Sequence, residues 1–189
     1  MIIKIDVDGV IRDIISAMCK VYNERFGGNL KVSDIDDYDV NTNFPEVYKQ
    51  TGRKPTEYFF TDNADLIFET VSLPFKGVKD AIDKLMDNGH KVVIVTWQFS
   101  LKNIKHTLDF LEMHGIRYND ICFTQDKWIV NGDYLIDDNP AFIMDVRDTS
   151  EKIVIDTPYN RNIPKIYTRC DSLKSAIKYI LTKEKREAA

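Results

Sequence analysis

The sequence has few cysteines, and they form no recognisable pattern. Cys19, Cys122 and Cys170 are odd in number, widely spaced and without a Cys-x-x-Cys pair. A disulfide framework needs paired cysteines, and structural zinc sites usually present two that are close in sequence. The pattern argues against both, and we expect three reduced thiols with structural roles.

The sequence also lacks long apolar runs and any excess of positive charge. Its longest aliphatic stretches, such as residues 92–95, fall far short of the roughly 20 residues that a membrane-spanning helix requires. The chain has 26 Lys and Arg residues against 30 Asp and Glu, a net charge of −4. This balance argues against a nucleic-acid partner and against a polybasic membrane anchor. We expect a soluble protein in which any anionic ligand is bound by a local group of residues.

No targeting segment is visible at the start of the sequence. Met1-Ile2-Ile3 leads directly into an apolar run of strand character, and a charge follows at Lys4. A secretory signal would instead place a charged segment before a longer apolar one. We therefore expect a cytoplasmic protein.

The 189 residues, 43% of them apolar, are enough for one sizeable core with an elaboration. Short apolar runs alternate with segments of helical periodicity, which predicts an α/β fold, a Rossmann-like parallel sheet covered by helices on both faces. The predicted strands are 2–5, 91–96, 120–123, 134–136 and 152–155. One predicted helix begins at Ile14 and stops at Gly27-Gly28, a second begins at Val78 and ends at Asn88-Gly89, and the others are 101–114, 141–147 and 172–181.

Residues 30–73 break this rhythm. They are rich in acids, carry scattered aromatic side chains and contain no long strand-like run. We expect an inserted, mainly helical unit with short helices at 46–50, 56–60 and 64–71. The predicted organisation is a core of residues 1–29 and 74–189 interrupted by this insertion.

Unusual polar residues follow the predicted strands. Asp6 and Asp8 come after the first strand, Thr96 and Asp137-Asp138 end or follow two others, and Lys127 lies in a loop. Ligands of parallel sheets bind beyond the carboxyl ends of the strands, so these residues should converge. Several carboxylates close together repel one another without a cation, and an oxygen-rich site suits Mg²⁺. With a lysine and a hydroxyl group beside it, such a site binds phosphate.

These residues resemble, in chain order, the four motifs of the haloacid dehalogenase superfamily. Asp6-Val7-Asp8-Gly9-Val10 resembles the first motif, and Thr96, Lys127 and Asp137-Asp138 resemble the second, third and fourth. Residues 73–78, 126–138 and 156–161 resemble the 5′(3′)-deoxyribonucleotidase branch of that superfamily. The resemblance implies a Mg²⁺-dependent phosphomonoesterase that hydrolyses (deoxy)nucleoside monophosphates through an aspartyl-phosphate.

The resemblance also implies roles for the acidic residues. Asp6 is the implied nucleophile, and Asp8 acts as general acid and then as general base while its backbone carbonyl binds the metal. In this branch the metal-binding acid lies eleven positions after the lysine, which makes Asp138 a ligand beside Asp6. Asp137 then orients a metal-bound water or Lys127, and the reverse order of these two acids stays open.

The phosphate group is implied to be held by the Thr96 hydroxyl, the Lys127 amine and the Trp97 backbone amide. The branch usually has Ser after the threonine of the second motif, whereas this sequence has Trp97-Gln98. One side-chain contact to phosphate is therefore lost, which affects affinity or substrate preference.

Residues 30–73 fit a small helical cap that closes over such a site and excludes water. Tyr38, Val40, Phe44 and Phe68 are the predicted apolar lining, with ordinary packing inside the cap as the alternative for the aromatic side chains. The stretch 159–161 either binds substrate or shapes a loop.

Other interpretations stay open at this point. Asp137-Asp138, before Asn139-Pro140, also suits the start of a helix. His90, His106 and His114 lie in or near predicted helices among charged residues, and we expect surface positions without ligand roles. A capped phosphatase of another small phosphomonoester is the first alternative function. A receiver-like phosphoacceptor module is the second, although receivers are shorter and lack an insertion after the first strand.

Overall fold

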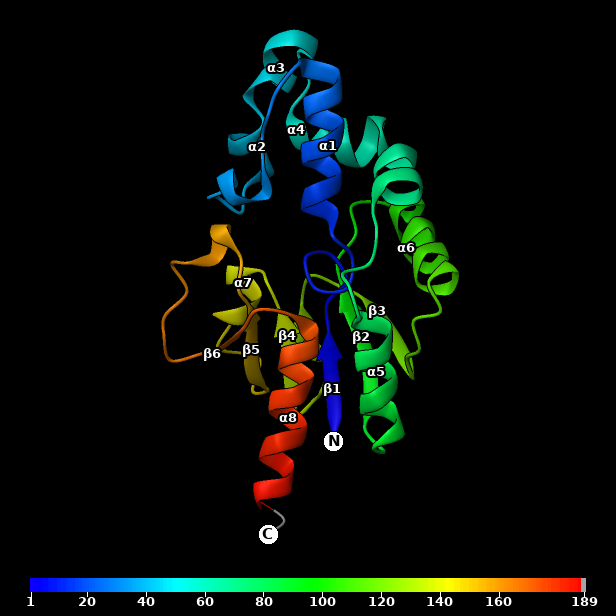
Figure 1. Cartoon of the computed structure of the whole chain (residues 1–189), viewed down its shortest axis with the longest axis vertical. Helices are drawn as coiled ribbons and strands as arrows, with labels where there is room; N and C mark the ends of the chain where they lie inside the picture. The colour runs from blue at the N-terminus through cyan, green and yellow to red at the C-terminus, as the bar shows by residue number, and fades with distance from the viewer. Residues whose placement is uncertain (188–189) are drawn as a thin grey trace.

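The computed structural model describes residues 1–187, except the side chains of residues 70 and 71. Six parallel strands form one sheet in the order β3-β2-β1-β4-β5-β6, and Figure 1 shows β1 in its centre. This confirms the predicted α/β, Rossmann-like class. The strands are β1 (Ile2–Ile5), β2 (Lys91–Thr96), β3 (Asp120–Phe123), β4 (Tyr134–Asp137), β5 (Glu151–Ile155) and β6 (Thr168–Cys170).

Helices cover both faces of the sheet. On β5, Ile153 and Ile155 belong to the main core cluster, together with residues of the helices α5 (Val78–Asp87) and α8 (Leu173–Glu187). Val154 points to the other face and packs on Ile143 of the helix α7 (Pro140–Ile143). Successive side chains of a strand alternate between faces, so an uninterrupted apolar strand is buried on both.

A second hydrophobic cluster lies beyond the carboxyl ends of the strands. It joins the helix α1 (Ile14–Phe26) to the inserted segment, and Figure 1 shows the two side by side at the top of the molecule. Tyr22 of α1 meets Phe44 with 5.3 Å between ring centroids. The insertion contains η1 (Val32–Asp34), α2 (Val40–Asn43), α3 (Pro45–Thr51), α4 (Pro55–Glu57), η2 (Tyr58–Asp62) and η3 (Leu66–Val71), the last two wound as π-helix.

The chain enters and leaves this upper part along two adjacent segments. The amide of Asp13 donates to Leu73 O at 2.9 Å, and the amide of Phe75 donates to Ile11 O at 2.9 Å. The upper part is thus joined to the sheet by a paired crossing. Within residues 1–187, no helix is both long enough and apolar enough to cross a membrane.

Two of the three histidines are not surface residues, contrary to our expectation. His90 and His106 are each only 4% exposed. His106 belongs to the helix α6 (Leu101–Met113) and lies between two carboxylates of the insertion, 3.0 Å from Asp65 and 2.7 Å from Glu69. The two carboxylates lie within ion-pair distance of its ring nitrogens, although neither nitrogen makes a hydrogen bond.

The structure differs from the predicted elements in two places. The helix predicted at 141–147 ends at Ile143, because the Asp145 carboxylate accepts a hydrogen bond from the amide of Arg147. Such side-chain to backbone bonds favour turns over helix. The strand β6 was not predicted, since its three residues, Thr-Arg-Cys, are not an apolar run.

The three cysteines form no disulfide. Cys19 is buried, and burial raises the pKa of its thiol to about 11. The thiol therefore stays protonated at neutral pH and packs as a small apolar side chain.

Candidate active site

The Asp-x-Asp segment leaves the central strand at the edge where β2 and β4 also end. The Asp6 amide donates to Ile136 O of β4 at 3.1 Å, which continues the sheet pairing by one residue. The chain then turns at Gly9, whose φ is +77°. A Cβ atom there would lie 2.1 Å from Oδ2 of Asp138. Only glycine allows both this backbone conformation and this close approach.

Lys127 joins two of the carboxylates. It is 2% exposed, and its Nζ lies 3.0 Å from Oδ1 of Asp6 and 2.6 Å from Oδ2 of Asp137. Burial disfavours the charged amine, but Asp137 and Asp6 outweigh burial and raise the pKa of Lys127. The lysine is therefore a fixed positive charge beside Asp6.

Asp137 and Asp138 have different surroundings. Both oxygens of Asp137 are engaged, Oδ2 by Lys127 and Oδ1 by the amide of Asn139 at 2.9 Å. Asp138 accepts a hydrogen bond on Oδ2 from the Tyr159 hydroxyl, whereas its buried Oδ1 has no hydrogen-bond partner. Burial, with repulsion from Asp137 and Asp6, raises the pKa of Asp138 well above its usual value.

Asp6, Asp137 and Asp138 form a group that fits a cation. All three are buried, and each offers a carboxylate oxygen within 4.8 Å of the others. Burial raises the pKa of Asp6 to about 6, against the opposing effect of Lys127. The raised pKa values of Asp6 and Asp138, together with the unpartnered Oδ1 of Asp138, describe surroundings in which a hard cation is favourable.

Asp8 lies next to this group but has other partners. Its Oδ1 accepts from Nε of Arg12 at 2.7 Å, and its Oδ2 accepts from Nη2 of Arg12 at 3.0 Å and from Nε2 of Gln98 at 2.9 Å. Arg12 is fully buried, with its guanidinium carbon 4.4 Å from the ring centroid of Phe68. Sequence reasoning missed Arg12 and Gln98, because neither belongs to a motif that we used.

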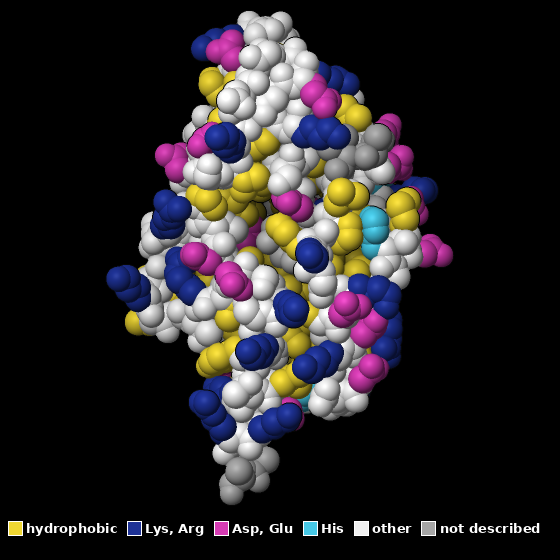
Figure 2. All heavy atoms as spheres, in the orientation of Figure 1, with side chains coloured by type: hydrophobic (Ala, Val, Ile, Leu, Met, Phe, Trp, Pro, Cys, Tyr) yellow, Lys and Arg dark blue, Asp and Glu magenta, His cyan; other side chains and the backbone are white. Residues whose placement is uncertain are grey.

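A cavity opens above these carboxylates, between the sheet and the inserted segment. Figure 2 shows hydrophobic and acidic side chains together in the hollow between the upper and lower parts of the molecule. The residues around the cavity are Asp6, Asp8, Ile14, Ile15, Met18, Tyr38, Val40, Thr56, Phe60, Phe68, Thr96, Trp97, Gln98, Phe99, Asp138, Phe142 and Tyr159. Its lining therefore combines an acidic floor with aromatic walls.

The structure brings most of the residues selected from sequence to this cavity. Thr96, at the end of β2, is 1% exposed, and Trp97 is 36% exposed at the rim. Tyr38, Val40 and Phe68 line it from the insertion. Phe44 does not line the cavity: it is 0% exposed inside the second hydrophobic cluster, where it packs on Tyr22 and Phe59.

Residues 159–161 do two different things. Tyr159 lines the cavity and holds Asp138, while Asn160 is fully buried and donates to Asp138 O and Ile155 O at 2.8 Å each. Arg161 is exposed. The tyrosine thus belongs to the site and the asparagine shapes the loop beside it.

The parallel sheet, the Asp-x-Asp segment after its central strand and the lysine between two carboxylates form the arrangement that the resemblance to haloacid dehalogenase phosphatases predicts. The sequence model of the family described as "5′ nucleotidase, deoxy (Pyrimidine), cytosolic type C protein" matches residues 1–186. The chain belongs to this family, and it is a phosphoric monoester hydrolase of the 5′-nucleotidase type.

One relative is similar in sequence, and two solved structures are similar in fold. A protein of Chlorobaculum tepidum named "Putative 5′(3′)-deoxyribonucleotidase" is 27% identical over 158 residues, which are 78% of this chain and 74% of that protein. A "predicted phosphatase" from Clostridium acetobutylicum has a similar fold, with a TM-score of 0.62, 16% identity and coverage of 96% of this chain and 98% of that one. D,D-heptose 1,7-bisphosphate phosphatase from B. bronchiseptica, crystallised with magnesium and phosphate, gives a TM-score of 0.53, 14% identity and the same coverage.

Proposed function

We propose that this chain hydrolyses (deoxy)nucleoside monophosphates in the cytoplasm, with Mg²⁺ as cofactor and an aspartyl-phosphate on Asp6 as intermediate. The observation that carries the proposal is the position of Lys127 between Asp6 and Asp137, beside the unpartnered oxygen of Asp138. Asp6, which is paired with this lysine, and Asp138 both line an aromatic cavity, and such a site suits a phosphate attached to a planar base.

Asp6 is the nucleophile of this reaction. One of its carboxylate oxygens attacks phosphorus, and the bond between phosphorus and the nucleoside oxygen breaks. The leaving oxygen takes a proton from Asp8, so the nucleoside departs as a neutral alcohol. Asp8 then takes a proton from water, whose oxygen attacks the aspartyl-phosphate and releases inorganic phosphate.

The metal would be held by the Asp6 and Asp138 carboxylates and by the backbone carbonyl of Asp8. When bound, Mg²⁺ supplies positive charge that offsets the repulsion between an anionic nucleophile and an anionic substrate. Asp137 orients Lys127, since its two oxygens already have partners. The donor set fits, because every protein ligand is a hard oxygen atom.

Three groups of the chain hold the phosphate. Lys127 contributes a charge-assisted hydrogen bond, Thr96 its hydroxyl group and Trp97 its backbone amide. Thr96 and Trp97 both line the cavity at the end of β2. These groups act on the phosphate and leave recognition of the base to other residues.

The nucleoside binds under the cap, which we assign to residues 30–73 above a core of residues 1–29 and 74–189. The aromatic rings of Tyr38 and Phe68 line the cavity together with Val40. Stacking on aromatic side chains is tolerant of base identity, so these residues favour a nucleoside over a sugar without selecting one base. The cap also excludes water from the phosphoryl group.

Phosphate release from a panel of nucleoside monophosphates and sugar phosphates, with Mg²⁺ and with chelator, tests the proposal. We expect the highest kcat/KM for a nucleoside monophosphate and loss of turnover with chelator. Preference for a sugar phosphate would instead indicate a capped phosphatase of another small phosphomonoester. Phosphorylation without turnover would indicate a phosphoacceptor module.

A further inference from the structure

A buried lysine lies beneath the active site, in the central strand. Lys4 of β1 is two residues before Asp6 and is 0% exposed. Its Nζ lies 2.6 Å from Oδ2 of Asp148, which is also buried. Lysine is almost never fully buried unless it is paired, so this position calls for an explanation.

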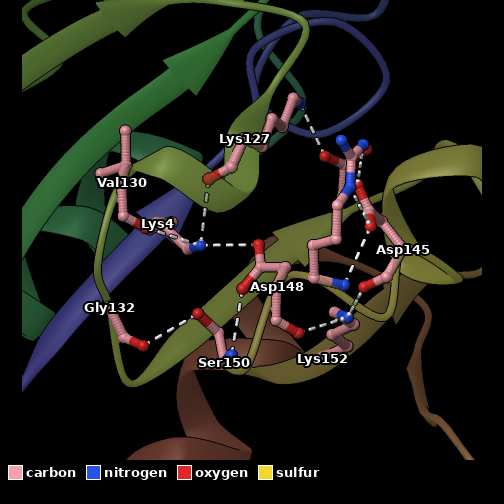
Figure 3. Close-up of polar contacts among 10 residues, drawn as sticks. Lys4, Lys127, Val130, Gly132, Asp145, Asp148, Ser150 and Lys152 are labelled. Atoms are coloured by element: carbon pink, nitrogen blue, oxygen red, sulfur yellow. Dashed lines mark hydrogen bonds and ion pairs between the residues drawn. The ribbon is translucent and has the colours of Figure 1, made fainter.

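The Lys4 amine also holds the turn that carries Lys127. It donates hydrogen bonds to Lys127 O at 3.3 Å and to Val130 O at 3.0 Å, as Figure 3 shows. These two carbonyls begin and follow the single turn η4 (Lys127–Ile129). One amine therefore fixes both ends of that turn.

Lys127 is therefore held at its side-chain amine and at its backbone carbonyl, in both cases by residues of β1 or of the segment that continues it. Asp6 binds the amine of Lys127 at 3.0 Å, and Lys4 binds its backbone carbonyl. Residues two apart in an extended segment point to the same side, which lets Lys4 and Asp6 reach the same loop. The position of the Lys127 amine relative to Asp6 is thereby fixed through a short rigid path.

The surroundings of Lys4 are built to hold its side chain. A Cβ atom on Gly132 would lie 2.9 Å from Cγ of Lys4, and Gly132 does not adopt a positive φ, so what glycine provides there is space. Asp148 is itself fixed, because its Oδ1 accepts from the amide of Ser150 at 3.0 Å. The hydroxyl group of Ser150 in turn donates to Gly132 O at 2.8 Å.

Stability alone does not account for this arrangement. Replacing a buried ion pair with apolar side chains of similar volume is often neutral or stabilising. We propose that Lys4 is a positioning residue, which places the Lys127 amine where it meets the phosphate. The inference rests on the proposed role of Lys127 as a phosphate-binding group and does not depend on which base or sugar the substrate carries.

Lys152 supplies a matched control for the test. It is 8% exposed and donates to Asp148 O at 2.8 Å and to Asp145 O, on the side of Asp148 away from Lys4 in Figure 3. Among the described residues it makes no hydrogen bond to η4. Lys4→Met and Lys152→Met each remove one buried amine from this group of contacts, but only the first releases the turn that carries Lys127.

The experiment compares the two variants with wild type by kcat for an aryl phosphate, by calorimetric binding of inorganic phosphate with Mg²⁺ and by thermal unfolding. We expect Lys4→Met to lose roughly 10- to 100-fold in kcat, as misplaced groups do, and about tenfold in phosphate affinity. Lys152→Met should keep kcat and phosphate affinity within about twofold of wild type, while its unfolding midpoint falls as much as that of Lys4→Met. Equal losses of kcat in the two variants, or an unchanged kcat in Lys4→Met, would overturn the inference.

A second variant covers the case in which Lys4→Met does not fold. Lys4→Met/Asp148→Asn removes both charges, so no buried carboxylate is left unpaired. Loss of kcat and phosphate affinity in this variant supports the positioning role, and wild-type values overturn it. If wild type hydrolyses aryl phosphates but no nucleotide, the proposed nucleotide substrate is wrong. The aryl phosphate assay still tests the role of Lys4 in that case.

Discussion

Tyr159 donates a hydrogen bond to Oδ2 of Asp138, and Oδ1 of the same carboxylate has no hydrogen-bond partner. The tyrosine therefore fixes the carboxylate while leaving Oδ1 free for a cation. Groups that orient metal ligands in this way typically contribute 10- to 100-fold to metal affinity or activity.

We expect Tyr159→Phe to raise the Mg²⁺ concentration for half-maximal activity by roughly 10-fold, because Asp138 loses its orienting donor. Mg²⁺ titration of phosphate release measures this. Tyr167→Phe is the control, since Tyr167 packs in a separate hydrophobic cluster. An unchanged Mg²⁺ requirement in Tyr159→Phe would show that the tyrosine serves the loop and not the metal site.

Asp8→Asn should slow poor leaving groups more than good ones. Asparagine preserves the size of the side chain and can still accept from Arg12, but it transfers no proton. General acid catalysis contributes roughly 10²- to 10⁴-fold, so kcat/KM, which reports the steps up to departure of the leaving group, should fall by that much more for an alkyl phosphate than for an activated aryl phosphate. Equal losses of kcat/KM for the two substrates would rule out the general-acid role.

The contribution of Asp6 to the stability of the metal-free protein should decrease as pH rises. Burial raises the pKa of Asp6 from 3.8 to about 6, so between about pH 4 and pH 6 the folded state binds more protons than the unfolded state. The shift corresponds to about 3 kcal/mol of unfolding free energy, present below pH 4 and lost above pH 6. Asp138, whose pKa is also raised, acts in the same direction.

Denaturant unfolding at several pH values, with chelator, measures this decrease. Asp6→Asn should show a shallower decrease, because asparagine does not titrate. Mg²⁺ should stabilise wild type more at pH 7 than at pH 4, since it binds the ionised carboxylates. The same change of stability from pH 4 to pH 6 in Asp6→Asn as in wild type would contradict the raised pKa of Asp6.

Substitutions of Tyr38 and Phe44 should have different effects, the first on substrate specificity and the second on packing inside the cap. Tyr38 lines the cavity and is 46% exposed, whereas Phe44 is 0% exposed inside the second cluster. Base stacking is worth about 1–3 kcal/mol, so Tyr38→Ala should lower kcat/KM for a deoxynucleotide roughly 5- to 150-fold more than for a generic aryl phosphate.

Phe44→Ala should instead lower the unfolding free energy by about 3–5 kcal/mol and leave the ratio of the two kcat/KM values unchanged. Both ratios and both unfolding curves can be measured on the same preparations. A larger change of the ratio in Phe44→Ala than in Tyr38→Ala would show that the shape of the cap, not contact with Tyr38, selects the substrate.

The sequence predicts the acidic floor of the site well, because the end of a buried strand can be recognised from a few neighbouring residues. Asp6, Thr96 and Asp137 each end or follow a short apolar run, and parallel pairing brings such ends to one edge. The strands were predicted for the same reason, with the exception of β6, which lies at the edge of the sheet and needs little apolar character.

The walls of the site were predicted less completely because they depend on long-range packing. Phe60 and Phe99 stack with 4.9 Å between ring centroids, although they are distant in sequence. Arg12 is buried only because Asp8, Thr107 and the ring of Phe68 surround it. A charged residue next to an aspartate resembles an ordinary surface position until the tertiary partners are known.

The direct test of the account is mass spectrometry of the Asp8→Asn variant, acid-quenched after reaction with an activated aryl phosphate and Mg²⁺. The first step needs no general acid with this leaving group, while the second lacks its base, so the phosphorylated enzyme should accumulate. We predict one phosphoryl group on the peptide that contains Asp6, and none when Asp6→Asn is added. Turnover without any phosphorylated peptide, or the phosphoryl group on another residue, would contradict the account.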